Sequence, residues 1–420
     1  MPSEFQSKFS QALESGLQQL ASRDQRRSLA EMFGVNLCSN DYLGLAQSPA
    51  LREAVLEAVR SASRVGGTGS RLLSGHAAAW SDLEAEFAQF AGTEAALYFT
   101  SGYAANIGLI TSLAGTSDLI FSDALNHASL IDGIRLSGAH KSIYAHLDLN
   151  MLEWFLREHR HAKGRKFIVT ETVFSMDGDI APLAEIQALA DRYNAAVILD
   201  EAHATAVHGP NGRGIAAQHR AQHGDSGNII AAVHTCGKAV ASAGAFVCGS
   251  AMLKDHLINH ARTFIFTTAL PPYLAAQIRA ALHLAQQMDE QRSSLQKNSQ
   301  NLRDALHAQG WNTAASKSQI IPVIIGKNEG ALSAASFLRQ EGFAVRAIRP
   351  PTVPQGSARL RFSLTTSITP SDLSRLTECL QQVRNDFGDA CHVSEPLRSA
   401  ATELDAHQSG RAASGAAGHS

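Results

Sequence analysis

Short apolar runs alternate with helical patterns over residues 95–249, and this alternation constrains the fold more than any other feature of the chain. Strands that are buried on both faces form short continuous apolar runs, and a helix between two of them returns the chain to the same edge of the sheet. We therefore predict an α/β domain with a mostly parallel sheet and helices on both faces. The predicted strands are residues 96–99, 119–121, 142–144, 167–169, 196–199, 229–233 and 245–248.

One of the intervening helices has recognisable ends. Pro182 suits a first helical turn, and Asn194 suits the point where a helix stops. The apolar residues between them recur at helical spacing, namely Leu183, Ile186, Leu189, Ala190 and Tyr193. This segment is predicted to be a crossover helix between two strands.

The rest of the chain divides into three further parts. Apolar residues at helical spacing over residues 5–20 predict a helix in an N-terminal arm, residues 1–48, which precedes the large domain at residues 49–275. A long helical pattern after Pro271-Pro272, followed by strand patterns at 320–325, 344–348 and 359–363, predicts a smaller α+β domain over residues 276–390. Residues 391–420 have too few large apolar side chains to offset the entropy of ordering, so a disordered tail is expected.

Composition excludes several classes of protein. The 420-residue chain has 45% hydrophobic residues and a formal net charge of -2. It contains no run of Lys and Arg that would follow a nucleic acid backbone, so nucleic acid is not an expected partner. No stretch approaches the roughly 18 apolar residues that cross a bilayer, so no membrane partner is expected. The five cysteines are scattered without disulfide or zinc spacing, which fits a reducing cytoplasm: Cys38, Cys236, Cys248, Cys379 and Cys391.

An acid and an amine follow neighbouring strands of the predicted sheet. Asp200 closes one apolar run, and Lys238 comes shortly after a later one. Pyridoxal 5'-phosphate (PLP) needs a lysine for its aldehyde and a carboxylate that keeps its ring nitrogen protonated. Either residue alone is more often an ordinary solvated charge, but the pair in this setting predicts a PLP site.

Other polar residues also follow predicted strands, where open α/β sheets bind ligands. Gly102 and Tyr103 open a helix after a strand, and backbone N–H groups there suit a phosphate. His127 could stack on an aromatic ring, Ser175 could donate a hydrogen bond, and Thr235 carries a hydroxyl suited to phosphate. Each signal is weak alone, because strand ends often carry such residues, but together they describe one site.

The ordered set resembles the fold type I PLP-dependent enzymes and, within them, the α-oxoamine synthase family. The similarity extends over roughly residues 5–383. The motifs that carry it are SNDYLGL at 39–45, GSRLLSG at 69–75, NHAS at 126–129, FSMDGD at 174–179, DEAHAT at 200–205 and TTALPP at 267–272.

The resemblance implies a role for each site residue. Lys238 would hold PLP and act as general base, Asp200 would keep the ring nitrogen protonated, and His127 would stack on the ring, as catalytic residues. His203, also catalytic, would hydrogen-bond the ring hydroxyl with Ser175 nearby. The phosphate would be held by Gly102, Tyr103 and Thr235, and by Thr268 of a second subunit, which implies a homodimer.

Substrates are implied by the segment IRPPTVP at 348–354 together with RLR at 359–361. Within the family it is most similar to enzymes that join L-alanine to a pimeloyl thioester, carried by coenzyme A or by acyl carrier protein. Thr352, Arg361, Arg23 and His127 would bind substrate, with the Arg361 guanidinium suited to the amino acid carboxylate. Other members of the family condense glycine or serine with different acyl-CoAs.

Several alternatives compete with this hypothesis. A nucleotide-binding loop is disfavoured because Lys238 is followed by Ala239 where a P-loop has Ser or Thr, and a metal site on His203 and His208 lacks a third ligand. A non-catalytic subunit of the same family would have lost the lysine. An aminotransferase would share the PLP chemistry but not the segment at 348–354.

Overall fold

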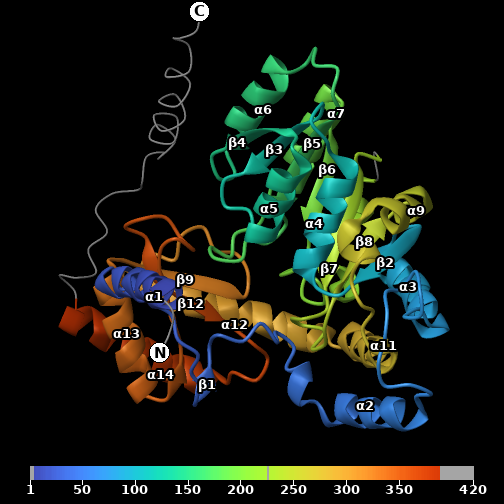
Figure 1. Cartoon of the computed structure of the whole chain (residues 1–420). Helices are drawn as coiled ribbons and strands as arrows, with labels where there is room; N and C mark the ends of the chain where they lie inside the picture. Colours follow the sequence, from blue (N-terminus) through green and yellow to red (C-terminus); the bar gives the residue numbers. More distant parts are fainter. Residues whose placement is uncertain (1–3, 225–226, 388–420) are drawn as a thin grey trace, which may run out of the picture.

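The structure is a computed structural model and describes residues 4–224 and 227–387. The predicted tail at residues 391–420 lies outside the described residues. Figure 1 shows two bodies of secondary structure. No helix in the described ranges is long and apolar enough to cross a membrane.

Seven strands form the sheet of the larger body, in the order β2-β8-β7-β6-β5-β3-β4. Neighbours from β7 through β4 are parallel, whereas β8 runs antiparallel to both β2 and β7. The predicted α/β architecture with a mostly parallel sheet is therefore confirmed. The strands are β2 (Ala95–Phe99), β3 (Leu119–Asp123), β4 (His140–Tyr144), β5 (Lys166–Glu171), β6 (Ala196–Asp200), β7 (Ile229–Thr235) and β8 (Ala245–Gly249).

Both faces of this sheet are buried, which is why its strands are continuous apolar runs. Successive side chains of a strand point to opposite faces. In β3, Ile120 belongs to a buried cluster with Leu109, while Leu119 and Phe121 belong to a different cluster with Leu152. The helices of this body are α3 (Ala78–Ala91), α4 (Gly102–Leu113), α5 (Ala128–Ser137), α6 (Leu149–Glu158), α7 (Leu183–Tyr193), α8 (Ile215–His223), α9 (Ala251–His260) and α10 (Arg262–Ile265).

The crossover helix predicted between Pro182 and Asn194 is α7. Pro182 is its N-cap, and Asn194 ends it in the left-handed conformation at φ 51°. Asn tolerates this conformation better than most residues because its short polar side chain can hydrogen-bond locally. Both ends of the helix were therefore readable from the sequence.

The smaller body is a three-stranded antiparallel sheet, in the order β11-β12-β9, with helices packed on it. The N-terminal segment joins it, because β1 pairs with β10 in parallel. Its elements are β9 (Ile320–Gly326), β10 (Phe343–Ala344), β11 (Ala347–Ile348), β12 (Ala358–Ser363), α12 (Asp289–Ala308), α13 (Asn328–Gln340) and α14 (Pro370–Phe387). The remaining elements are α1 (Glu4–Ser22), β1 (Val35–Asn36), the 3-10 turns at Leu45–Gln47 and Pro210–Gly212, α2 (Pro49–Ser61) and α11 (Tyr273–Gln286).

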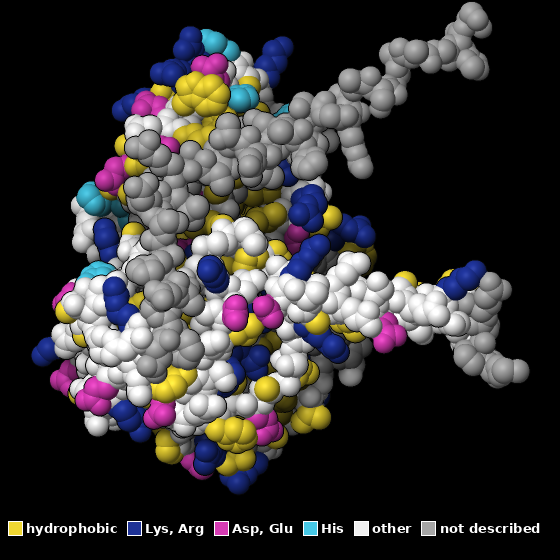
Figure 2. Space-filling model, turned by 90° about the vertical axis from the view of Figure 1, so that its left-hand side faces the viewer, with side chains coloured by type: hydrophobic (Ala, Val, Ile, Leu, Met, Phe, Trp, Pro, Cys, Tyr) yellow, Lys and Arg dark blue, Asp and Glu magenta, His cyan; other side chains and the backbone are white. Residues whose placement is uncertain are grey.

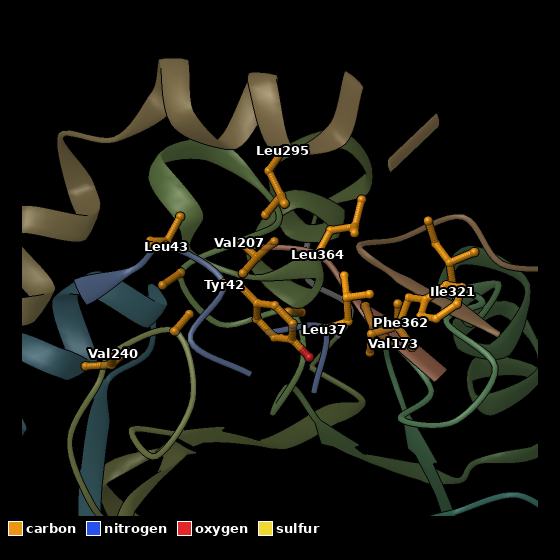
Figure 3. Packing of buried hydrophobic residues seen from close by; sticks show 14 of the residues in the cluster. Leu37, Tyr42, Leu43, Val173, Val207, Val240, Leu295, Ile321, Phe362 and Leu364 are labelled. Carbon is orange, nitrogen blue, oxygen red and sulfur yellow. The ribbon is translucent and has the colours of Figure 1, made fainter. Parts of the chain in front are cut away.

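One core joins the two bodies. Figure 3 shows Leu37 and Tyr42 of the N-terminal segment packed among side chains of both, including Val207 before α8 and Phe362 on β12. Leu295 of α12 completes this part of the cluster. The N-terminal residues are therefore a structural link between the sheets. By contrast, α1 is solvent-exposed along its length and projects from the molecule (Figure 2).

Candidate active site

The carboxyl ends of β6 and β7 bring the predicted amine and acid to one place. Asp200 is the last residue of β6, and Lys238 follows the end of its parallel neighbour β7 by three residues. The Lys238 Nζ lies 2.8 Å from the Nε2 of His203. The site is therefore at the edge of the sheet where α/β folds bind ligands.

Burial lowers the pKa of Lys238 to about 8, and the carboxyl groups of Asp200 and Glu171 only partly oppose this effect. A charged ammonium loses hydration when it is buried, so the neutral amine becomes easier to form. An ordinary lysine is almost fully protonated at pH 8. Lys238 can therefore serve as a nucleophile or a base close to neutral pH.

A buried polar chain fixes Asp200. Its carboxylate accepts a hydrogen bond from the Nδ2 of Asn106 at 2.7 Å and one from the backbone N–H of Ala202 at 2.8 Å. The same Asn106 amide donates to Ser129 Oγ at 2.9 Å, and Ser129 Oγ lies 2.7 Å from Nδ1 of His127. Asp200 and His127 are thus coupled through Asn106 and Ser129, two residues that sequence reasoning missed. The signal that could have pointed to Asn106 was its position in the first turns of a helix that follows a strand.

His203 lies between the N-terminal segment and the lysine. Its Nδ1 is 2.6 Å from the hydroxyl of Tyr42, which donates its own proton to Asn40 at 3.1 Å. The Nδ1 therefore carries the proton and the Nε2 accepts from Lys238. Burial, with the nearby Lys238 charge, holds the pKa of His203 well below its usual value, so this imidazole is neutral.

The first turn of α4 forms a cradle beside Thr235. Ser101 caps the helix by accepting from the N–H of Ala104 at 3.0 Å, which leaves the amides of Gly102 and Tyr103 at the N-terminus. A Cβ atom on Gly102 would lie 3.5 Å from Thr235 Oγ1 and would occupy this space. Tyr103 points its hydroxyl away, toward Asp132, so its backbone is what faces the cradle.

Glu171, at the end of β5, is a buried acid that sequence reasoning did not single out. It is in register with Asp200, and it accepts a hydrogen bond at Oε2 from the N–H of Ser175 at 3.2 Å. Its Oε1 has no hydrogen-bond partner among the described residues. Burial, and then the Asp200 charge, raise the pKa of Glu171 well above its ordinary value.

Arg361, on β12, presents a buried guanidinium from the smaller sheet. Its Nε donates to the carbonyl of Ser175 at 2.6 Å, its Nη1 to Ser363 Oγ at 2.6 Å, and its Nη2 to Asn40 at 3.3 Å. No carboxylate forms an ion pair with it in the described part of the chain. A buried cation without a carboxylate is suited to an anionic ligand.

Three of the predicted residues are not gathered with the others. Thr268 is exposed and forms a β-bridge with Ser70. Thr352 and Arg23 are also exposed, and it is Arg27, not Arg23, that contacts Thr352, with Nη2 3.2 Å from its Oγ1. Within one chain, the site therefore comprises the residues at the strand ends together with Arg361.

A second polar cluster lies at the same edge of the sheet and was not foreseen. His146 bridges Asp123 at 2.9 Å and Asp179 at 2.6 Å. These carboxylates raise its pKa to about 10 despite its burial, so the imidazole is charged. The cluster ties the end of β3 to the loop that carries Ser175.

Comparison with known proteins identifies the class first. The profile of the family described as aminotransferase class I and II matches residues 34–380, which is most of the chain. A serine palmitoyltransferase from S. paucimobilis, solved with bound PLP and myriocin, superposes with a TM-score of 0.82 at 29% identity, covering 92% of this chain and 100% of that one. This is the fold of fold type I PLP-dependent enzymes.

More specific relatives narrow the class. The 8-amino-7-oxononanoate synthase of Geobacter sulfurreducens is 44% identical over 387 residues, or 89% of this chain and 97% of the relative. The structure of the Francisella tularensis 8-amino-7-oxononanoate synthase has a TM-score of 0.73 at 29% identity and covers 85% of this chain and 98% of that one. The chain belongs to the 8-amino-7-oxononanoate synthase family, which comprises PLP-dependent acyltransferases of biotin biosynthesis.

The residues present fit PLP. A half-buried amine, Lys238, and a buried carboxylate, Asp200, stand at the ends of neighbouring strands. The cradle at Gly102 offers N–H groups for a phosphate, and the orphaned side-chain oxygens of Asn106 and Glu171 show that polar groups at this edge have bonding capacity to spare.

Proposed function

We propose that this protein condenses L-alanine with a pimeloyl thioester, giving 8-amino-7-oxononanoate, carbon dioxide and the free carrier thiol. A carbon–carbon bond forms between the α-carbon of alanine and the acyl carbonyl carbon, while the carbon–sulfur bond breaks. The alanine carboxylate leaves as carbon dioxide. The observation that carries the proposal is Arg361, a buried guanidinium with no carboxylate partner in the described ranges, whose hydrogen bonds reach the loop of Ser175 beside the Lys238 and Asp200 pair.

PLP, when bound, supplies an electron sink that makes the α-proton of an amino acid acidic. Asp200 would keep the pyridine nitrogen protonated, and Asn106 and Ala202 hold that carboxylate in place. His203 and Ser175 would hydrogen-bond the ring hydroxyl of the cofactor, and His127 would stack on its ring. The amides of Gly102 and Tyr103, with the hydroxyl of Thr235, would hold the phosphate.

The amino group of Lys238 holds the cofactor in the resting enzyme and accepts the α-proton of alanine. A base with a pKa of about 8 is well matched to this task near neutral pH. Two of the five guanidinium N–H groups of Arg361 remain after its three hydrogen bonds, and these orient the alanine carboxylate. Thr352 and an N-terminal arginine, Arg23, contact the acyl substrate.

We further propose a cytoplasmic homodimer in which Thr268 reaches the phosphate site of the partner subunit. The exposure of Thr268, and of Phe266 beside it at 69%, supports this arrangement, because such residues become buried in an interface. The same proposal divides the chain into an arm at residues 1–48, a PLP-binding domain at 49–275 and a smaller domain at 276–390.

The direct test is product formation by the purified, PLP-loaded protein with pimeloyl-CoA and either L-alanine, glycine or L-serine. Free thiol and carbon dioxide are measured together. We expect alanine-dependent release of both in equal amounts. Release with glycine or serine instead, or only with a shorter acyl-CoA, would assign a different α-oxoamine synthase activity. A half-reaction that aminates a keto acid would restore the aminotransferase alternative.

A further inference from the structure

Gln319 reaches from the smaller body to the active site of the larger one. It comes directly before β9, and its side chain is buried. Its Nε2 donates to the backbone carbonyl of His203 at 2.9 Å. Within the described ranges no backbone N–H donates to that carbonyl, although a buried carbonyl needs a hydrogen-bond partner. The Gln319 amide therefore holds the main chain of a residue whose ring lies 2.8 Å from the Lys238 amine.

A strand pair of the smaller sheet fixes Gln319 in place. Its carbonyl accepts a hydrogen bond from the N–H of Leu364 at 2.9 Å, just beyond β12, and the carbonyl of Ser318 accepts one from Arg303 at 2.6 Å. The same strand, β12, carries Arg361 and pairs with β9. The guanidinium proposed to bind the amino acid carboxylate and the amide that holds the histidine therefore belong to one strand pair.

His208 determines which way the Gln319 amide points. Its Nε2 lies 3.0 Å from the Oε1 of Gln319, and an amide oxygen can only accept a hydrogen bond. The proton on this side of the imidazole is therefore on Nε2. Burial lowers the pKa of His208, which favours the neutral ring. With its oxygen held in this way, the amide turns its NH2 group toward the carbonyl of His203.

Gln319 also lies close to Tyr42, which contacts the imidazole of His203. Burial raises the pKa of Tyr42, and contacts with Arg361 and then Gln319 partly oppose this rise. The Tyr42 hydroxyl is 2.6 Å from the Nδ1 of His203. One side chain of the smaller body is therefore near both the main chain of His203 and the partner of its ring.

We propose that Gln319 is a positioning residue for the PLP chemistry, through which the smaller sheet sets the position of His203. The inference rests on the proposed roles of the site residues and adds one residue of the smaller body to them. A side chain that contacts a cofactor must itself be held by its neighbours, because small displacements weaken the contact. The bond to the His203 carbonyl fixes where its imidazole meets the ring hydroxyl of the cofactor and the amine of Lys238.

The test compares two buried pairs of glutamine and histidine. Gln319→Met removes the amide and keeps a side chain of similar length, and His208→Phe removes the group that orients the amide. Gln187→Met and His219→Phe are the matched controls, because these two residues form a buried hydrogen bond between α7 and α8 rather than at the strand ends. For each PLP-loaded variant, three quantities are measured: the pH at which the absorbance spectrum of bound PLP changes, the rate of alanine α-proton exchange and the denaturation midpoint.

Gln319→Met should shift the pH of the spectral change by about 0.5 unit or more and slow exchange at saturating alanine by about fivefold, the effect of one lost hydrogen bond. The alanine concentration that gives half-maximal exchange should be unchanged, because Arg361 is intact. His208→Phe should give a smaller shift of the same sign. The two control variants should lower the denaturation midpoint and leave the spectral pH unchanged.

An unchanged spectral pH in Gln319→Met, or an equal shift in Gln187→Met, would mean that Gln319 serves stability alone and would overturn the assignment. A higher alanine requirement with unchanged exchange at saturation would also overturn it, because the effect would then lie at Arg361. If Gln319→Met does not fold, His208→Phe decides by the same measurements. The absorbance measurement needs neither alanine nor a thioester. A wild-type protein that exchanges only glycine or serine would therefore refute the proposed substrate and leave the role of Gln319 standing.

Discussion

Two histidines at the same edge of the seven-stranded sheet are held in opposite protonation states. His203, beyond β6, faces the hydroxyl of Tyr42 and the amine of Lys238, and its pKa is well below normal. His146, beyond β4, faces the carboxylates of Asp123 and Asp179, and its pKa is raised to about 10. Both rings are largely buried, so burial alone does not decide their charge.

The difference lies in the partners. Burial disfavours the charged form of any imidazole, and only the two carboxylates at His146 reverse that effect. A neutral ring beside Lys238 leaves the lysine free to exchange protons, whereas a charged ring between two acids fixes the loop of Ser175. The region of His203 is therefore arranged for proton transfer, whereas the region of His146 holds a loop in place. Each of the following changes tests that division.

Lys238→Ala should have the largest effect. Without the amine, exchange of the alanine α-proton should fall by about a thousandfold or more, because a positioned base typically contributes 10²–10⁴. The variant should fold and bind PLP, but borohydride should no longer fix the cofactor to the chain. Exchange is measured by NMR in deuterium oxide. Fixation of PLP to the Lys238→Ala protein would place the cofactor lysine elsewhere.

Asp200→Asn should slow the same exchange by about a hundredfold or more, because a neutral amide does not hold a proton on the pyridine nitrogen. The matched change in the other region is Asp123→Asn, which alters a buried acid at the same sheet edge. It should leave exchange within a few fold of wild type and lower the denaturation midpoint. Equal losses of exchange in the two variants would erase the distinction between the regions.

His146→Gln should lower the free energy of unfolding by on the order of 3 kcal/mol at pH 6, because it leaves two buried carboxylates unpaired. The folded-state pKa, about 10, lies above the ordinary value of 6.5. The stabilisation is therefore fully present below about pH 6.5 and is lost as the pH rises through about 10. Urea unfolding at pH 6 and pH 10.5, with His161→Gln as an exposed control, measures it. A destabilisation that does not change with pH would mean that the ring is uncharged.

Tyr42→Phe should have the smallest effect. Loss of one buried hydrogen bond to His203 costs about 1 kcal/mol, and proton exchange should slow by about fivefold as the ring loses its fixed tautomer. Tyr144→Phe is the control, because its buried hydroxyl has no hydrogen-bond partner among the described residues. Unfolding and exchange are measured for both. Equal effects of the two variants would mean that Tyr42 does not fix the tautomer of His203.

Strand ends made part of the site predictable. Asp200 and Lys238 could be paired from sequence because parallel strands end at a common edge, and the structure places them there. Asn106, Ser129 and Glu171 carry equally strong contacts but belong to helix turns and strand ends that have many other possible neighbours. Nothing in their local sequence gives the partner.

The sequence by itself determined the architecture and the chemical class of the site. The alternation of short apolar runs with helical patterns predicted the mostly parallel sheet, and Pro182 and Asn194 marked the ends of α7. The order of polar residues along the chain indicated PLP. Only the tertiary structure decided which groups are charged and which distant residues each buried side chain contacts. Those properties depend on burial and on partners far apart in the chain, such as Arg361 with Ser175 or His146 with Asp179, and a local pattern contains neither.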